Sequence, residues 1–304
     1  MREGQRRRWP AAWPAAWAGS RAGSRAGAPT AAAKLVMYGV LCLLAVPFLF
    51  PTWWMVTSSL KPVNEIFAFP PSLLPADVSL AAYRSVFTVQ PFARQYLNCG
   101  YIAAIVTVGT LMVASLSGYA FARIRFRGAN ALFLLVLSGL LIPSEVTIVP
   151  LFQLFRTLGM IDTHWPLILV PIFGAPSVLA TFILRQFFIA LPVELEEAAR
   201  LDGLGRFGTF RRIALPLARP ALGAVAVITF LHSWNLYLEP IVYLSTPERF
   251  TLPQALTQFV DAYGGPMWDV QLAAASLTAV PVLIVFVIAQ RQFVEGLAHS
   301  GMKG

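Results

Sequence analysis

Six apolar blocks, separated by shorter polar segments, account for most of the chain. Each block is near the roughly 20 residues that an α-helix needs to cross about 30 Å of hydrocarbon. Because lipid offers no water to the backbone, the blocks are expected to be helices; strands of a β-barrel would be about ten residues long and strictly alternating. The predicted spans are residues 35–57, 98–121, 131–152, 165–187, 218–240 and 271–290.

Proline and overall composition refine this prediction. The chain is 57% apolar and only 12% charged, about half the usual charged share, which excludes an ordinary soluble domain. Prolines inside or beside the blocks are expected to kink the helices, because neighbouring spans can satisfy the carbonyls that a proline leaves unbonded. They are Pro47, Pro51, Pro143, Pro171, Pro176 and Pro281. The predicted fold is an all-α, polytopic membrane protein with six transmembrane helices.

The basic residues are distributed unevenly between the two sides of these spans. With the N-terminus assigned to the cytoplasm, eighteen of the 23 Lys and Arg residues fall inside and five fall outside. Such a bias is typical of cytoplasmic loops, so both termini are predicted to be cytoplasmic in a multi-pass protein of the inner (cytoplasmic) membrane. The net charge of +9 therefore marks a membrane side, and no nucleic-acid partner is expected.

The ends of the chain and its cysteines give little sign of further domains. Residues 1–34 repeat PAAW and AGSR units and are predicted to be a disordered basic tail. Residues 35–290 would form the membrane domain, with a cytoplasmic segment at 192–217, and residues 291–304 a cytoplasmic C-terminal tail. Cys42 and Cys99 lie in or beside apolar spans and are expected to be small buried fillers rather than a disulfide.

Residues for catalysis are missing from the sequence. His164, His232 and His299 are predicted in an outer loop, a span and the tail, so no metal site is expected. No lysine follows a glycine, which excludes a phosphate-binding Gly-x-x-x-x-Gly-Lys-Ser/Thr loop. The chain is therefore predicted to be no enzyme and to bind no cofactor. Any step driven by ATP and magnesium would take place on another subunit.

The fifth block, in contrast, carries polar residues at membrane depth. At about 1.5 Å per residue from Arg219, His232 lies roughly 20 Å deep, and Asn235 lies deeper. Buried polar groups of this kind face the bundle or an aqueous path rather than lipid. His232, Trp234 and Asn235 are thus candidates for a translocation path. The alternative, that they form interhelical hydrogen bonds holding the bundle together, remains open.

Between the fourth and fifth blocks, the segment from Leu195 to Pro220 is the most charged part of the chain. Acidic residues after Pro192 favour a helix start there, and Gly203-Leu204-Gly205 is expected to end that helix. A second short helix would then place three apolar residues on one side: Phe207, Phe210 and Ile213. This apolar face has no partner in its own loop, so it is expected either to rest on lipid headgroups or to enter a groove on a soluble partner.

The same segment carries a family resemblance. "EAARLDG", Glu197 to Gly203, followed by "IALPLARPAL", Ile213 to Leu222, resembles the EAA signature of permease subunits of bacterial ABC importers. Further stretches resemble the carbohydrate-uptake branch, and within it the maltose-G-like permeases. They include "WWMVTSSLKPVNEIF", "NCGYIAAIVTVGTL", "YAFARIRFRG", "LIPSEVTIVPLFQLFRTLGMIDT", "LRQFFIALPVELEEAARLDG", "FLHSWNLYLEP" and "QRQFVEGLAHSGMKG". The resemblance runs in order over residues 35–304.

The resemblance implies an importer assembled from several chains: this permease, a second and different permease, two ATPase subunits and an extracytoplasmic solute-binding protein. It also implies that a set of residues in the EAA segment docks on the ATPase: Glu197, Ala198, Ala199, Asp202, Gly203, Ile213, Leu215 and Pro216. Leu204 stands where the family commonly has alanine. The solute is expected to be a sugar, an oligosaccharide or a related polyol. A secondary transporter or a membrane scaffold remains the alternative function.

Overall fold

The computed structural model describes residues 30–301, and within this range helices form all regular structure except one isolated bridge between Val260 and Pro266. The chain divides into two compact units, Met1–Pro51 and Thr52–Gly304. The first long helix, α1 (Ala31–Ser58), starts before the predicted boundary at residue 35. The rest of the predicted tail, residues 1–29, lies outside the described residues.

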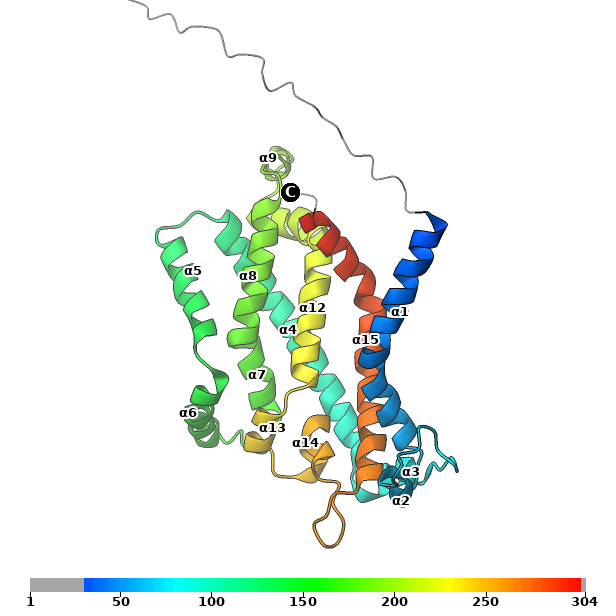
Figure 1. Ribbon diagram of the computed structural model, residues 1–304. Coiled ribbons are helices and arrows are strands. Elements are labelled where there is room, and N and C mark those ends of the chain that lie inside the picture. Colours follow the sequence, from blue (N-terminus) through cyan, green and yellow to red (C-terminus); the bar gives the residue numbers. More distant parts are fainter. Residues whose placement is uncertain (1–29, 302–304) are drawn as a thin grey trace, which may run out of the picture. The chain divides into compact units, whose positions relative to one another are not determined.

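The unit from Thr52 onward is a helical bundle (Figure 1). Its longest helices are α4 (Phe92–Arg123), α7 (Trp165–Phe173) continued by α8 (Ala175–Ala190), α12 (Arg219–Trp234) and α15 (Trp268–Gly301). Shorter elements are α2 (Val63–Ile66), α3 (Ala81–Val89), α5 (Ala129–Ser138), η1 (Gly139–Leu141), α6 (Ser144–Thr157), α9 (Glu194–Leu201), α10 (Arg206–Thr209), η2 (Phe210–Ala214), α11 (Leu215–Leu217), α13 (Leu238–Tyr243), η3 (Pro247–Arg249) and α14 (Leu252–Leu256).

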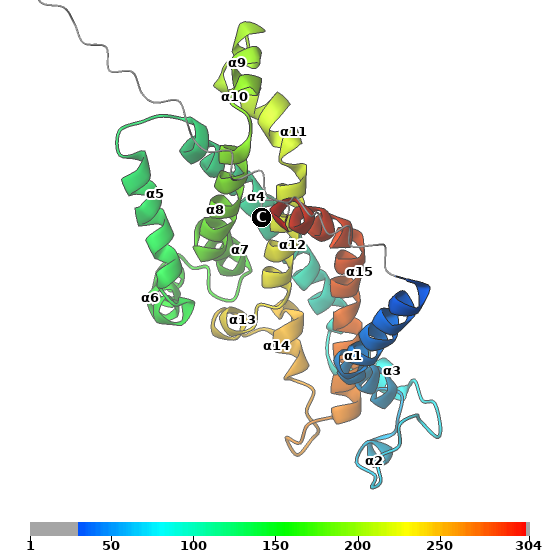
Figure 2. The same cartoon turned by 45° about the horizontal axis from the view of Figure 1, so that its top comes forward.

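Helix α4 is the centre of this bundle, packed against α7, α8 and α12 (Figures 1 and 2). The α4–α8 crossing is closest at Gly118, where an added Cβ would lie 3.0 Å from the backbone nitrogen of Arg185 and 3.2 Å from the carbonyl oxygen of Thr181. Small residues of this kind let membrane helices approach closely and gain van der Waals contact. Farther along α4, Cys99 and Trp234 belong to one buried cluster that includes the start of α15.

Two of the predicted spans are not straight helices. The third block turns by 96° between η1 and α6, where Pro143 stands just before α6 and has no N–H to continue the helix. The helix of the fifth block ends at Trp234, and at its end both the backbone N–H and the side-chain amide of Asn235 donate to the carbonyl oxygen of Leu231, at 3.1 and 2.8 Å. Four helices in residues 30–301 are long and apolar enough to cross a membrane, or up to six if each bent pair forms one span.

Other expectations are corrected at a finer scale. Pro47, Pro51, Pro171 and Pro281 lie inside helices, whereas Pro143 and Pro176 stand at helix starts. Cys99 is buried, but Cys42 is exposed and lies in an apolar stretch of α1 that has no buried residue. Helix α15 continues to Gly301, so most of the predicted C-terminal tail is helical.

The two ends of the bundle carry different segments (Figure 1). The end of α8, α9 and the end of α15 lie at one end, and α2, α3, α6 and α14 lie at the other. Arg123, at the end of α4, contacts Glu196 in α9 and so belongs to the first end. Arg84 in α3 and Arg156 in α6 belong to the second. Arg123, predicted on the cytoplasmic side, and Arg84 and Arg156, predicted on the outer side, thus lie at opposite ends of the bundle.

Candidate functional site

The charged segment forms the predicted pair of short helices. Helix α9 has three acidic residues in its first turn, where the positive end of the helix dipole stabilises them. The chain then turns at Gly203, whose φ of +79° is a left-handed conformation that glycine adopts without strain. The amide of Leu204 closes the turn by donating to the carbonyl oxygen of Ala199 at 2.9 Å. The second helix begins at Arg206 as α10 and continues through η2 and α11.

The expectation that the whole apolar face of this segment lacks a partner is wrong for Phe210. Its ring lies 5.1 Å from that of Tyr119 in α4 and 6.4 Å from that of Phe188 in α8, measured between centroids. The second helix folds back onto the ends of α4 and α8, which bury this side chain. Leu201 and Phe207 remain uncovered, at 90% and 67% exposure. We call the surface around these two residues the α9–α10 surface.

The residues expected to dock on an ATPase differ in their accessibility. On the first helix and its turn, Glu197, Ala198, Asp202 and Gly203 are exposed, whereas Ala199 is buried against the bundle. On the second, Pro216 is exposed, and Ile213 and Leu215 are half-buried. The exposed members lie on the same two short helices as Leu201 and Phe207. A partner could therefore contact the acidic and the apolar residues together.

A contact that sequence reasoning missed fastens α9 to the bundle. The Nε atom of Arg123 lies 3.2 Å from Oε1 of Glu196, and both side chains are about nine-tenths buried. The guanidinium of Arg123 also donates to the carbonyl oxygen of Leu191, just after α8. A basic residue ending α4 and an acidic residue starting α9 were visible in the sequence. No spacing rule, however, connects positions so far apart.

Farther along the bundle, the structure contains a cavity of about 760 Å³. Three parts of the chain form its wall: the bend between α5 and α6, the junction of α7 with α8, and the last turns of α12 with α13. The lining is mostly apolar, and five residues supply polar side chains: Ser144, Thr147, Thr229, His232 and Glu239. The only imidazole and the only carboxylate of the lining, those of His232 and Glu239, come from the same stretch of chain.

Only one of the three residues expected on a translocation path lines this cavity. His232 is part of the wall, but Trp234 is 2% exposed and donates through Nε1 to the carbonyl oxygen of Thr278 in α15 at 3.3 Å. Asn235 is not part of the lining and is bonded to Leu231 within its own chain segment. The contact of Trp234 with α15 is of the interhelical kind that the bundle-packing alternative expects, whereas Asn235 is exposed and its bond stays within its own segment. Glu239, rather than either of them, joins His232 at the cavity.

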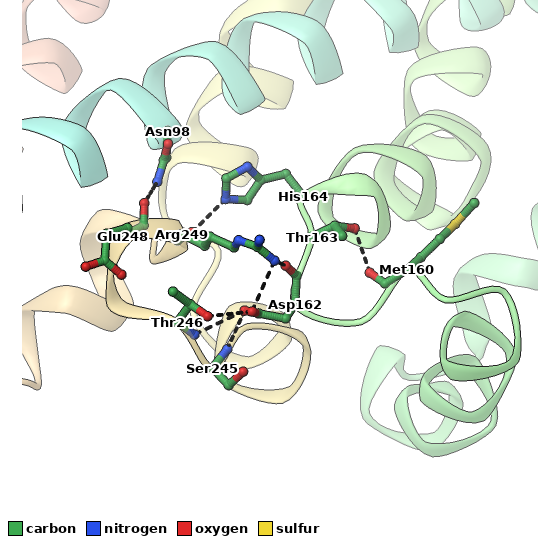
Figure 3. A network of polar contacts seen from close by, with 9 residues as sticks. All are labelled: Asn98, Met160, Asp162, Thr163, His164, Ser245, Thr246, Glu248 and Arg249. Carbon is green, nitrogen blue, oxygen red and sulfur yellow. Dashed lines mark hydrogen bonds and ion pairs between the residues drawn. The ribbon is translucent and has the colours of Figure 1, made fainter.

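A polar network ties together segments at the opposite end of the bundle from α9 (Figure 3). Asp162, with φ of 56°, accepts hydrogen bonds from the amides of Ser245 and Thr246 at 3.0 and 3.1 Å and from Oγ1 of Thr246 at 2.5 Å. Arg249 adds an ion pair, Nη1 to Oδ2, at 3.1 Å. Burial raises the pKa of Asp162, but the bonds from Thr246 and Ser245 and the charge of Arg249 outweigh it and lower the pKa to about 2.

His164 and Asn98 extend this network to α4. His164 Nε2 donates to the carbonyl oxygen of Arg249 at 2.6 Å, and its ring also bonds the hydroxyl of Tyr101. Asn98 Nδ2 donates to the carbonyl oxygen of Glu248 at 2.9 Å (Figure 3). We call these residues the outer network. They connect the loop before α7, the loop after α13 and α4, so the network holds the cavity-forming helices in register.

Within the described part of the chain, no three His, Cys, Asp or Glu side chains are grouped so as to hold a metal ion. The two candidate sites are an exposed surface with acidic and apolar residues at one end of the bundle and a mostly apolar cavity between its helices.

Comparisons with known proteins agree in pointing to transport. Residues 110–299 match the family model described as the inner membrane component of binding-protein-dependent transport systems. The arabinooligosaccharides transport system permease protein AraQ of Halalkalibacterium halodurans is 38% identical over 84% of this chain and 91% of its own length. The sn-glycerol-3-phosphate transport system permease protein UgpE of Yersinia enterocolitica is 36% identical over 83% of this chain and 91% of its own.

Among solved structures, a chain of a bacterial ABC transporter involved in the import of the acidic polysaccharide alginate has a similar fold. Its TM-score is 0.74 at 23% sequence identity, and the match covers 85% of this chain and 95% of that one. A second structure of a bacterial alginate ABC transporter, in complex with an alginate pentasaccharide-bound periplasmic protein, matches with a TM-score of 0.56.

Proposed function

Because the chain belongs to the family of inner membrane components of binding-protein-dependent transport systems, we propose that it is a permease subunit of an ATP-driven importer of a carbohydrate. The solute would be a sugar, an oligosaccharide or a related polyol, as the names of the relatives suggest. The observation that carries the proposal is the α9–α10 surface, where the family's EAA signature leaves Leu201 and Phe207 without cover.

Six spans follow if each bent helix pair crosses the membrane once: α1, α4, α5 with α6, α7 with α8, α10–α11 with α12, and α15. Both termini are then cytoplasmic, as the bias of the basic residues favours. In this orientation the α9–α10 surface faces the cytoplasm, and the outer network faces the opposite side. The cavity lies between them.

The chain itself holds no nucleotide in this proposal. Two ATPase subunits bind ATP with its magnesium ion, and each docks on a permease in the cytoplasm. On this chain the docking surface consists of the exposed members of the EAA segment, above all Glu197 and Gly203, with Leu201 and Phe207 beside them. Closure of the ATPases moves this surface, and the spans switch between inward-facing and outward-facing arrangements as rigid bodies.

The cavity would be this chain's share of the solute path, completed by the second, different permease. A solute-binding protein on the outer side would deliver the solute. His232 and Glu239 offer hydrogen bonds to hydroxyl groups, and the apolar wall suits the C–H faces of a sugar ring. Trp234 holds the end of α12 beside this wall through its hydrogen bond to α15.

The test uses the complete transporter, made from this chain and the neighbouring-gene subunits, in proteoliposomes loaded with ATP. Labelled arabinotriose, maltotriose and glycerol 3-phosphate serve as probes, each with the solute-binding protein. We expect ATP-dependent uptake of at least one probe, and loss of ATPase copurification when Leu201 and Phe207 are both replaced by aspartate. Val78→Asp, in the loop before α3, is the control for a charge placed on an exposed apolar residue outside the predicted spans. Uptake that continues without the ATPase subunits would contradict the proposal.

A further inference from the structure

The ion pair between Arg123 and Glu196 joins three elements at one point. Arg123 is the last residue of α4, and Glu196 lies in the first turn of α9. Their Nε and Oε1 atoms are 3.2 Å apart, with side-chain exposures of 10% and 11%. The Arg123 guanidinium also reaches the carbonyl oxygen of Leu191, between α8 and α9. One side chain thus holds the central helix, the end of α8 and the start of the docking segment.

We propose that this buried ion pair is the mechanical link through which a displacement of α9 is passed to α4. The inference rests on the proposed function, because it takes α9 to be the element that an ATPase moves. Arg123 and Glu196 are then positioning residues, because neither side chain contacts the ATPase or the solute. The family's signature residue Glu197 lies next to Glu196 in sequence but is exposed, so the two acids have separate roles.

The first helix of the segment has few other attachments to the bundle. Of its eight residues, only Glu196 and Ala199 are buried. The second helix is held differently, by the ring of Phe210 between those of Tyr119 and Phe188. Without the ion pair, α9 would be held mainly by its contacts with α10 and η2 in the same segment and by the chain on either side of it. A displacement imposed on α9 would then tilt α9 alone and leave α4 in place.

The pair is a close contact between two charges that are largely removed from water. Its two facing atoms, Nε and Oε1, have no hydrogen-bond partner, so the electrostatic attraction between them is their main interaction. Removing one partner of a buried pair leaves the other charge without compensation, which is far less favourable than in water. Arg123 and Glu196 are therefore expected to stay together while α9 moves, and α4 follows.

Helix α4 can carry this movement to the cavity. It runs the length of the bundle against α8 and α12, and α12 contributes His232 to the cavity wall. At its far end, Asn98 bonds the carbonyl oxygen of Glu248 in the outer network. A shift delivered at Arg123 thus reaches both the cavity and the outer side through one continuous helix.

The experiment measures transmission without needing the solute. The complete transporter, with Cys42→Ser, Cys99→Ala and His232→Cys, is reconstituted, and a membrane-impermeant methanethiosulfonate reagent is added from the outer side. Labelling of the cysteine at position 232 is compared between nucleotide-free protein and protein trapped with ATP and vanadate. We expect trapping to change the labelling rate at least tenfold in the parent. Arg123→Gln and Glu196→Gln should reduce that change to less than twofold, and Arg123→Lys should restore part of it.

Arg125→Gln is the matched control, because Arg125 is an exposed arginine two residues from Arg123. It should leave the change in labelling intact. ATPase subunits must copurify with all variants in the parent's ratio and hydrolyse ATP. A full labelling change in both glutamine variants would overturn the inference. The inference would also be overturned if the labelling change were lost only in variants that no longer bind the ATPase subunits. Failure of the ATPase to bind the parent chain would instead refute the proposed function.

Discussion

The glycines of α4 give a quantitative test of how closely the bundle is packed. Alanine at Gly118 would place its Cβ 3.0 Å from the backbone nitrogen of Arg185 and 3.2 Å from the carbonyl oxygen of Thr181. Backbone atoms cannot rotate away, so α4 and α8 would have to separate. Overpacking of this kind costs about 1–3 kcal/mol. Gly100, in the same helix, has nothing within 4 Å of the added Cβ.

Gly100→Ala therefore removes a flexible residue without a clash, and should be neutral or stabilising by up to about 1 kcal/mol. Gly109→Ala falls between the two, because its Cβ would meet the Cδ1 and Cγ1 atoms of Ile172, which belong to a side chain that can change rotamer. The expected order of stability is Gly100→Ala, then Gly109→Ala, then Gly118→Ala.

Cys99 provides the assay, since it is 1% exposed and reacts only after unfolding. With Cys42 replaced by serine, a dye that fluoresces on reaction with a thiol reports the unfolding temperature of purified protein. Gly118→Ala should lower that temperature by several degrees, given about 2–4 °C per kcal/mol for a chain of this size. If Gly118→Ala unfolds at or above the parent temperature while Gly100→Ala unfolds below it, the packing argument fails.

Three further predictions concern the sites. Gly203→Ala should cost about 1 kcal/mol in the same assay, because φ is +79°, while Gly205→Ala, at φ −72°, should cost nothing; equal effects would contradict this. Asp162→Asn should lose roughly 2 kcal/mol at pH 7, since a pKa lowered from 3.8 to about 2 stabilises the fold above pH 3.8. The gap to the parent should narrow as pH falls toward 2, and a gap that is constant with pH would refute it. His232→Leu should change the KM or rate of uptake more than Asn235→Leu does, because only His232 lines the cavity; equal uptake kinetics would argue against a solute path there.

The apolar pattern predicted the helices well but not their directions. Hydropathy counts apolar residues, so it is blind to the end of α12 at Asn235, and proline indicated the position of the bend at Pro143 but not its angle of 96°. The short helices around Gly203 were predictable, because acidic first turns and glycine stops are local signals. The burial of Phe210 was not, since it depends on Tyr119 and Phe188 in other helices.

The interactions between distant segments were also beyond the sequence. Arg123 meets Glu196, and Asp162 meets Arg249, across long intervals that no periodicity connects. The motif pointed to the docking segment as a whole, yet it could not separate the exposed Glu197 from the buried Glu196. Composition likewise marked block five as unusual without distinguishing the cavity residue His232 from the buried Trp234.

The outer network has a practical consequence for engineering. Four donor atoms from Ser245, Thr246 and Arg249 converge on the carboxylate of Asp162, which itself lies in a left-handed backbone conformation. Loops 158–164 and 244–250 therefore form one structural unit that has to be exchanged as a whole, although the two loops are far apart in sequence. A hybrid permease made by grafting either loop alone from a relative would mismatch the carboxylate and its donors. Grafting both together should preserve the register of the cavity-forming helices.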